Sequence, residues 1–527
     1  MPQPPPARFD MARHCVGDPA QRQPEATALV VVHDAAAPAE AAERWTFAEL
    51  DDAVRAIAAG LAGLGLLPGE RVLVRLGNTS DYPLVFFAAI AAGLVAIPTS
   101  AQLTPEEVAV LVADSQCRLV VCDDALRVEV PAGVLTAGPA DLDRWRAGPQ
   151  RAAYADTAAD DPAYLVYTSG TTDRPKGVLH AHRAVWGRRP MYAAWLGIGP
   201  GDVMLHAGAF NWTYTLGVGL TDPWANDATA VVYDGPKDPT VWPRLIQRYR
   251  ATHFAAVPGV YRQILARGGL AEADLSSLRH GLVAGEALTA SLWARWREAT
   301  GRDLFEALGM SEVSTFVSSG PTVPTRPGSP GKPQPGRRVA VLAQDGPSTA
   351  PVPDGEIGLL AVHRSDPGLM LGYWRREQEA AAAYRGEWFV TSDLVHVGDG
   401  GYLYYHGRND DVMTAMGYRV SPLEVEHCLA RHPDVGEVAV AEVLVREGLR
   451  IITAFVVPTD PDDRESVDAA GILRYAAEHL AGYKRPREVV FVEALPRTAN
   501  GKVLRRELAA RHLGPAAAAD PPQSAVP

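Results

Sequence analysis

The strongest constraint on the fold is the regular alternation of apolar, strand-like runs with helix-like segments through the first half of the chain. Thr46 and Glu49 form a capping-box pattern before "LDDAVRAIAAGLAGLG", whose apolar spacing predicts an amphipathic helix. The strand-like run "RVLVRL" follows, and Thr104-Pro105 with Glu107 then predicts a second capped helix. Such alternation predicts α/β layers built around a largely parallel sheet.

Composition excludes several classes of protein. With 527 residues, 47% of them hydrophobic and 21% charged, the chain can form a large core without disulfide or metal staples. Its formal net charge of −12 argues against nucleic-acid partners and anionic membranes, but leaves room for a local basic pocket that binds phosphate. Four cysteines do not form a disulfide framework, so we expect a reducing, cytoplasmic setting.

No segment is expected to enter a membrane. The amino-terminal segment "MPQPPPARFDMARHC" has prolines and charges where a secretory signal needs an apolar core. The longest uncharged stretch, Tyr82–Ile97, is too short to cross a bilayer and is broken by Gly93. This stretch predicts a buried helix, a glycine turn and a short inner strand.

Changes in composition along the chain predict two domains. Proline and glycine become frequent over residues 319–336, which predicts turns before a strand-rich stretch with a hairpin at "GDGG". We expect a large N-terminal α/β body of layered sheets and helices over residues 1–407 and a hinge at 408–411. A small mobile C-terminal α/β domain should then occupy residues 412–513. The tail, 514–527, has too few apolar residues to order and is expected to be disordered.

The segment "YLVYTSGTTDRPKGVLHAH" carries the clearest chemistry. A buried strand leads into a loop rich in hydroxyl groups and glycine, followed by the cation of Lys176. Hydroxyls and backbone amides in such a turn form a concave donor surface suited to phosphate oxygens. The segment is not a P-loop, because Gly177 and not Ser or Thr follows the lysine. The residues predicted to bind phosphate here are Thr168, Ser169, Gly170, Thr171 and Thr172.

This loop resembles the T-S-G-T-T-G-x-P-K-G loop of the adenylate-forming (AMP-binding) superfamily, which includes acyl-CoA synthetases, nonribosomal-peptide adenylation domains and luciferases. The resemblance extends over most of the chain, to "LPRTANGKVLRREL". Asp173 is a departure, since it stands where the family has its second glycine. The resemblance implies binding of ATP and Mg2+, with Lys176 among the catalytic residues.

Two further segments resemble the family's nucleotide-binding parts. "FEALGMSEVS" is similar to the segment whose acidic residue holds Mg2+, which implies this role for Glu312, with Ser311 beside the nucleotide. One hard carboxylate together with phosphate oxygens and waters is an ordinary way to hold Mg2+. "VAGEAL" is similar to the loop that flanks adenine. The resemblance implies that this loop contributes Gly285, Glu286 and Ala287.

The C-terminal part carries the remaining family matches. Asp393 in "FVTSDLVHV" matches the family's ribose-binding aspartate, and Arg408 matches a second ribose or phosphate contact. Asp410 matches the hinge about which the family's small domain rotates. Lys502, after Asn500-Gly501, matches the catalytic lysine of the small domain.

The resemblance also implies where coenzyme A binds. The segment "AMGYRVSP" is expected to face its pantetheine arm and contributes Gly417, Tyr418 and Arg419. Thr414 departs from several relatives, which carry lysine at that position.

The resemblance further implies that the acyl pocket is lined by "HAGAFNWTYTLGVGL" and by the residue three before the expected magnesium-binding glutamate, here Gly309. Relatives specific for acetate have tryptophan at that position, so glycine predicts a deeper pocket. Trp212, Tyr214 and Val313 are candidate apolar walls, although each aromatic residue could equally belong to the core. "NWTY" and "GYRVSPLEVE" are most similar to medium-chain acyl-CoA and benzoate-CoA ligases.

Together these matches predict an acid–thiol ligase, an AMP-forming acyl-CoA synthetase. It would convert a medium-chain or aromatic carboxylic acid to an acyl-AMP and then to an acyl-CoA, releasing AMP and pyrophosphate. The expected partners are small molecules (the acid, ATP and coenzyme A), and the enzyme is expected to be a monomer or homodimer. Two alternatives stay open: a ligase that loads a carrier-protein thiol, and a non-catalytic nucleotide-binding protein of the same fold.

Overall fold

The computed structural model describes residues 4–168, 175–236, 238–409, 413–415, 418–446, 449–460, 467–480, 482–497 and 503–512. The described chain falls into two compact units. Unit 1 comprises the described parts of 1–340, 362–389 and 399–403. Unit 2 comprises those of 341–361, 390–398 and 404–527. Each unit is described below by itself.

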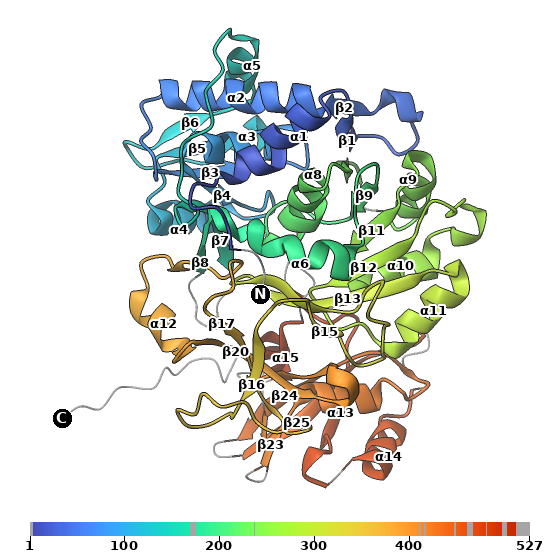
Figure 1. Cartoon of the computed structure of the whole chain (residues 1–527). Helices are drawn as coiled ribbons and strands as arrows, with labels where there is room; N and C mark the ends of the chain where they lie inside the picture. Colours follow the sequence, from blue (N-terminus) through green and yellow to red (C-terminus); the bar gives the residue numbers. More distant parts are fainter. Residues whose placement is uncertain are drawn as a thin grey trace, which may run out of the picture. The chain divides into compact units, whose positions relative to one another are not determined.

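A nine-stranded sheet runs through the described part of unit 1, in the order β15-β14-β13-β12-β11-β9-β10-β1-β2. Its inner strands, from β1 to β13, pair in parallel, while β2, β14 and β15 pair antiparallel at the two edges. The strands are β1 (Thr27–Val32), β2 (Glu43–Thr46), β9 (Val203–His206), β10 (Thr229–Tyr233), β11 (His253–Ala256), β12 (His280–Ala284), β13 (Asp303–Met310), β14 (Ser314–Ser318) and β15 (Lys332–Pro333). Figure 1 shows β11, β12 and β13 side by side, with helices α10 and α11 beside them.

A second, seven-stranded sheet of unit 1 has the order β18-β8-β7-β4-β3-β5-β6. Its strands β3 to β7 pair in parallel, and β8 and β18 are added antiparallel at one edge. The strands are β3 (Arg71–Arg75), β4 (Val95–Pro98), β5 (Leu119–Cys122), β6 (Leu135–Ala137), β7 (Pro162–Thr168), β8 (Lys176–Ala181) and β18 (Gly372–Tyr373). The prediction of a largely parallel α/β arrangement is therefore confirmed in both sheets.

Two helices of unit 1, α2 and α4, begin where the sequence predicts them. Both capping boxes form: Thr46 caps α2 together with Glu49, and Thr104 caps α4 together with Glu107. The stretch from Tyr82 consists, as predicted, of a buried helix, a turn at Gly93 with φ of +74°, and the strand β4. The helices are α1 (Asp18–Arg22), α2 (Phe47–Gly63), α3 (Asp81–Ala91), α4 (Pro105–Ser115), α5 (Pro139–Ala147), α6 (Arg189–Met191), α7 (Thr213–Leu216), α8 (Asp222–Ala225), α9 (Val241–Tyr249), α10 (Pro258–Arg267), α11 (Ala290–Thr300) and α12 (Glu377–Ala382).

The core of unit 1 lies between these helices and the sheets. Residues of α2 and α3 pack together with β3 and β4 in one large apolar cluster. A second cluster joins α9, α10 and α11 to the nine-stranded sheet through the buried side chains of Trp242, Tyr261 and Trp296. Because apolar burial is the main favourable term in folding, these clusters fix the strand ends from which the loops project.

A third sheet has the order β16-β17-β20-β19, and β21 pairs with β20. This pairing confirms the hairpin predicted around "GDGG". The strands are β16 (Val339–Leu342), β17 (Gly358–His363), β19 (Tyr384–Arg385), β20 (Trp388–Val397) and β21 (Leu403–Arg408).

The C-terminal part of unit 2 is a smaller α/β arrangement. A three-stranded sheet has the order β24-β25-β26, and its apolar residues pack with those of α13 and α14. The elements are β22 (Met413–Ala415), β23 (Tyr418–Val420), α13 (Pro422–Leu429), β24 (Val435–Arg446), β25 (Leu449–Pro458), α14 (Ala469–His479), β26 (Glu488–Phe491) and α15 (Arg505–His512). The tail over residues 514–527 lies outside the described residues.

Candidate active site

The hairpin of β7 and β8 carries the predicted phosphate loop. Thr168, the last residue of β7, pairs with Lys176, the first residue of β8, and its hydroxyl lies 3.5 Å from the Lys176 carbonyl oxygen. The loop therefore starts and ends on neighbouring positions of two paired strands. Ser169, Gly170, Thr171 and Thr172 lie outside the described residues, as does Asp173.

Lys176 is held at the edge of this sheet by two contacts from the segment after residue 370. Its ammonium nitrogen lies 2.9 Å from a carboxylate oxygen of Glu379 and 4.1 Å from the ring centre of Tyr373. The Lys176 side chain is partly buried, with 23% of its surface exposed, whereas that of Glu379 is 46% exposed. The hydrogen bond from Lys176 lowers the pKa of Glu379, which therefore carries its charge at neutral pH.

Glu312 lies in the turn between β13 and β14, and three contacts hold this turn. The Tyr373 hydroxyl donates to Oε1 of Glu312 at 2.8 Å, and the Met370 amide donates to the Glu312 carbonyl oxygen at 2.8 Å. His180 donates from Nε2 to the carbonyl oxygen of Ser311 at 2.8 Å. The structure thus brings two predicted catalytic residues, Lys176 and Glu312, onto the ring and the hydroxyl of one tyrosine.

The residues around Glu312 fit a magnesium ion. The carboxylate is half-buried, and one of its oxygens accepts a hydrogen bond from the Tyr373 hydroxyl. No cluster of three or more His, Cys, Asp or Glu residues suited to a metal occurs in the described ranges. A single carboxylate suits Mg2+, which is usually held by one or two carboxylates plus phosphate oxygens and waters.

The predicted adenine loop follows β12. Gly285 has φ of +93°, a left-handed conformation that favours glycine, and a Cβ there would lie 3.2 Å from Cη2 of Trp212. Glu286 is half-buried and lies 3.4 Å from Arg262, while Ala287 is exposed.

The end of this loop is tied to a buried carboxyl group. The Leu288 amide donates to Oε1 of Glu306 at 3.1 Å. Burial raises the pKa of Glu306 to about 8, although the hydrogen bond from Leu288 acts in the opposite direction.

The candidate acyl-pocket residues lie in different surroundings. Tyr214 is buried, its hydroxyl lies 3.3 Å from the Leu282 carbonyl oxygen, and its ring meets that of Trp212 edge to face at 5.3 Å. Val313 is also buried, with 1% of its surface exposed. Tyr214 belongs to a buried apolar cluster, whereas the half-buried Trp212 lies against the Gly285 loop.

The geometry at Gly309 bears on the expectation of a deeper acyl pocket, which stays a prediction. A Cβ at this position would lie 2.5 Å from the Ser314 carbonyl oxygen and 2.7 Å from Cα of Thr315. Because Gly309 has no side chain, the backbone of β14 can pack directly against it. The space that a Cβ would point into is therefore filled by β14 and is not open to an acid. Ser314 itself has φ of +76°, unusual for a residue with a side chain.

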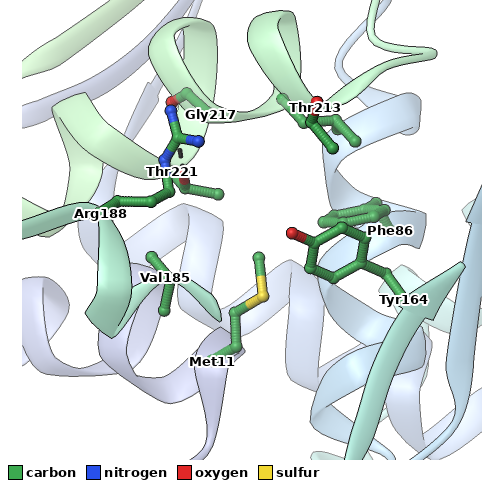
Figure 2. A pocket seen from close by; sticks show the side chains of 9 residues that line it. Met11, Phe86, Tyr164, Val185, Arg188, Thr213, Gly217 and Thr221 are labelled. Carbon is green, nitrogen blue, oxygen red and sulfur yellow. Dashed lines mark hydrogen bonds between the residues drawn. The ribbon is translucent and has the colours of Figure 1, made fainter. Parts of the chain in front are cut away.

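A small cavity lies beside the segment that contains Trp212 and Tyr214 (Figure 2). Its volume is about 10 Å³, which is enough for roughly one water. The lining residues are Met11, Phe86, Tyr164, Val185, Arg188, Thr213, Leu216, Gly217 and Thr221. A cavity of this volume is too small for a carboxylic acid, and none of the four candidate acyl-pocket residues lines it.

The two predicted ribose contacts lie on the hairpin of β20 and β21. Asp393 is 8% exposed, and its Oδ1 accepts a hydrogen bond from the Tyr405 hydroxyl at 3.3 Å. Arg408, at the end of β21, is half-buried, and the next amide, of Asn409, donates to the Ser392 carbonyl oxygen at 2.6 Å. Both predicted residues therefore project from paired strands.

Several predicted site residues are not described. The hinge residue Asp410, the catalytic Lys502 and Gly417 lie outside the described residues. Tyr418 and Arg419 are described only as backbone, in β23, where they pair with Ala415 and Thr414 of β22. The proposed boundary at 408–411 stays a prediction.

Sequence reasoning missed two residues that contact the predicted site segments: Tyr373, on Glu312 and Lys176, and Glu306, at the end of the predicted adenine loop. Tyr373 follows Gly372 in an ordinary "GYW" string, and nothing in its spacing marks it. Glu306 carried a signal, because a carboxylate between the apolar residues of a buried strand is unusual and normally has a bonding partner.

Comparison with known proteins establishes the family. The model of the AMP-binding enzyme family matches residues 17–374, and that of the AMP-binding enzyme C-terminal domain matches residues 424–502. The chain belongs to the AMP-binding enzyme family. Its fold is confirmed by a likeness to the crystal structure of the anthranilate CoA ligase AuaEII in complex with anthranoyl-AMP. The TM-score is 0.86 and the identity 28%, and the match covers 96% of this chain and 98% of that one.

Curated relatives of this AMP-binding enzyme confirm the predicted class of reaction. It is 32% identical to the 3-hydroxybenzoate–CoA ligase of Aromatoleum sp. (strain CIB), over 87% of this chain and 90% of the relative. It is 33% identical to the benzoate–CoA ligase of Thauera aromatica, over 84% of this chain and 86% of the relative. The protein is thus an AMP-forming acid–thiol ligase that uses an acid, ATP, Mg2+ and coenzyme A.

Two observations bear on the setting of this enzyme. Among the described residues, no helix combines the length and apolar character needed to cross a membrane. All four cysteines, Cys15, Cys117, Cys122 and Cys428, are buried and free.

Proposed function

We propose that this AMP-binding enzyme joins an aromatic or medium-chain carboxylic acid to coenzyme A through an acyl-adenylate. One observation carries the adenylation chemistry: Lys176 and Glu312 contact the ring and the hydroxyl of Tyr373. The preference for an aromatic acid is supported by the relatives named for 3-hydroxybenzoate, benzoate and anthranilate.

The first half-reaction makes a poor electrophile reactive. A carboxylate resists nucleophilic attack because of its charge and resonance, so its own oxygen attacks the α-phosphorus of ATP, and pyrophosphate leaves. Charge builds on phosphate oxygens in this step, and catalysis depends mainly on positioning and electrostatics. We assign Lys176 and the Thr168–Thr172 loop to the departing pyrophosphate, and Lys502 to the α-phosphate and the acid.

Magnesium would be held by Glu312, and there it would supply positive charge to the phosphate oxygens. For the nucleoside, we assign Asp393 and Arg408 to the ribose. The loop Gly285–Ala287 and Ser311 would lie along the adenine and the adjoining nucleotide groups. The half-burial of Arg408 and the near-complete burial of Asp393 on paired strands support fixed, directional contacts.

In the second half-reaction the coenzyme A thiol attacks the acyl carbon, and AMP leaves. We propose that the C-terminal domain turns about Asp410 between the two steps and presents Gly417, Tyr418 and Arg419 to the pantetheine arm. For the acid we propose walls that include Trp212, which lies against the Gly285 loop. A cytoplasmic setting is supported by the four free cysteines, and we expect a monomer or homodimer.

The test is a pyrophosphate-release screen over acetate, hexanoate, branched acids and benzoates, with and without coenzyme A. We expect release with hexanoate or benzoates and an acyl-CoA product only when coenzyme A is present. A product formed on holo-carrier protein but not on coenzyme A would favour the carrier-loading alternative. No release with any acid would favour the non-catalytic one.

Lys502→Ala separates the half-reactions. It should nearly abolish pyrophosphate release while sparing thioester formation from supplied acyl-AMP, because the lysine is assigned to the first step only. Equal loss of both half-reactions would contradict the rotation of the small domain.

A further inference from the structure

Tyr373 lies on β18, which pairs with β8, the strand that begins with Lys176. It pairs with Val178 across β18 and β8, and the amides on either side of it, of Leu371 and Trp374, donate to the carbonyl oxygens of Leu179 and Gly177 at 2.8 Å. The backbone of Tyr373 therefore cannot shift without breaking strand pairing. Its side chain leaves this rigid support and reaches a different sheet.

The side chain of Tyr373 contacts two groups of opposite charge. Its hydroxyl donates to Glu312 at 2.8 Å, and the ammonium group of Lys176 lies 4.1 Å from its ring centre. The same segment also binds the Glu312 backbone, through the Met370 amide at 2.8 Å. Tyr373 is thus in direct contact with both the proposed magnesium ligand and the proposed phosphate-binding cation.

In this arrangement Lys176 pairs with the largely exposed carboxylate of Glu379, and Glu312 accepts its hydrogen bond from Tyr373. A direct ion pair between Lys176 and Glu312 would neutralise the cation that pyrophosphate needs and the anion that Mg2+ needs. The tyrosine hydroxyl instead satisfies one oxygen of Glu312 without a positive charge, and leaves its other lone pairs free for a metal. The ring attracts Lys176 only weakly, so an incoming phosphate can draw the lysine away from both the ring and Glu379.

We propose that Tyr373 is a positioning residue that orients the Glu312 carboxylate for Mg2+ and holds Lys176 beside the phosphate loop, preventing the two from pairing. This inference rests on the proposed function of the site. Tyr373 does not touch the reacting atoms. It acts through Glu312 and Lys176.

Two substitutions divide its roles. Tyr373→Phe removes the hydroxyl but keeps the ring, and Tyr373→Leu removes both contacts. For Tyr373→Phe we expect the Mg2+ concentration at half-maximal pyrophosphate release to rise about tenfold, since a hydrogen bond to a carboxylate is lost. Tyr373→Leu should in addition raise the KM for ATP. Thioester formation from supplied benzoyl-AMP and coenzyme A should stay near the wild-type rate in both variants.

A matched control is Tyr154→Phe. The Tyr154 hydroxyl also donates to a carboxylate, that of Asp51 at 2.6 Å, but neither residue belongs to the site. This variant should keep the wild-type response to Mg2+. A second readout is binding of the Mn2+–ATP complex, followed by electron paramagnetic resonance, which needs no turnover and should weaken in Tyr373→Phe.

An unchanged response to Mg2+ in Tyr373→Phe would overturn the inference. So would an equal loss of both half-reactions together with a lower melting temperature, because that pattern belongs to a merely structural tyrosine. A wild-type enzyme that is inert with every acid would refute the proposed function instead. The Mn2+–ATP measurement would then still test Tyr373.

Discussion

The guanidinium group of Arg188 lies 2.6 Å from the Asp222 carboxylate, and the two side chains are only 6% and 0% exposed. Arg188 also donates to the Ser314 hydroxyl, in the strand that follows the Glu312 turn. Gly217 makes room for this pair, since a Cβ there would lie 1.9 Å from Nη2 of Arg188. A buried ion pair thus supports the strand that follows the Glu312 turn. Figure 2 shows the Arg188 side chain beside Gly217.

Asp222→Ala should destabilise the protein by about 3–5 kcal/mol, because it leaves the Arg188 charge buried without its partner. Gly217→Ala should also be strongly destabilising, through overlap with the guanidinium group. Denaturant unfolding measures both effects. Asp156→Ala, which removes the exposed partner of Arg8, is the control and should leave stability unchanged. If Asp222→Ala and Asp156→Ala lowered the free energy of unfolding equally, burial of the ion pair would not explain its contribution to stability.

Gly309→Trp should reduce kcat/KM for acetate, hexanoate and benzoate together and lower the melting temperature. The reason is steric, since even a Cβ would lie 2.5 Å from the Ser314 carbonyl oxygen. The measurement is kcat/KM for the three acids, beside thermal unfolding and the KM for ATP. A shift toward acetate with an unchanged melting temperature would instead support the sequence-based expectation that position 309 faces the acid.

Asp393→Ala should weaken AMP binding by roughly 1.5–3 kcal/mol, or about 10- to 150-fold, because the ribose loses a charged acceptor. Calorimetric titration with AMP measures this. Asp399→Ala removes an exposed carboxylate near the tip of the same hairpin and should not change the affinity. Unchanged AMP affinity in Asp393→Ala would remove this residue from the nucleotide site.

Acidification should destabilise the protein between pH 6.5 and about 4. Burial lowers the pKa of five histidines to about 3 or 4, so in this window the unfolded chain binds protons that the folded chain does not. Three carboxyl groups oppose this, because burial raises the pKa of Asp10 to about 7, that of Glu306 to about 8, and also that of Asp81. The histidines outnumber them, so stability should fall with falling pH. The five are His14, His180, His182, His206 and His280.

Denaturant unfolding from pH 7 to pH 4.5 measures this slope. His206→Asn keeps an acceptor near the Gly208 amide, which donates to Nδ1 of His206, but cannot take up a proton. It should therefore show a shallower loss of stability with falling pH than the wild type. Equal slopes for the two proteins would mean that His206 does not contribute.

Many features of this protein, such as its helix caps and the order of its strands and helices, depend on residues close together in the chain. For these features the sequence was sufficient to predict the structure. Caps such as Thr46 with Glu49 act over three residues, and a parallel α/β arrangement follows from the alternation of strand and helix patterns. The predicted phosphate loop and its lysine stand within nine residues of one another between two paired strands, so they could be recognised as one motif. The family and its reaction followed from these strings.

Only the tertiary structure decided which distant residues meet. Tyr373 reaches Glu312 across 61 positions and Lys176 across nearly two hundred, and no periodicity or spacing marks such a contact. Gly309 had a plausible role by its spacing from Glu312, but the backbone of β14 occupies the space beside it. Local hydrogen bonds and side-chain patterns are encoded in neighbouring residues, whereas packing between sheets depends on the whole arrangement of strands.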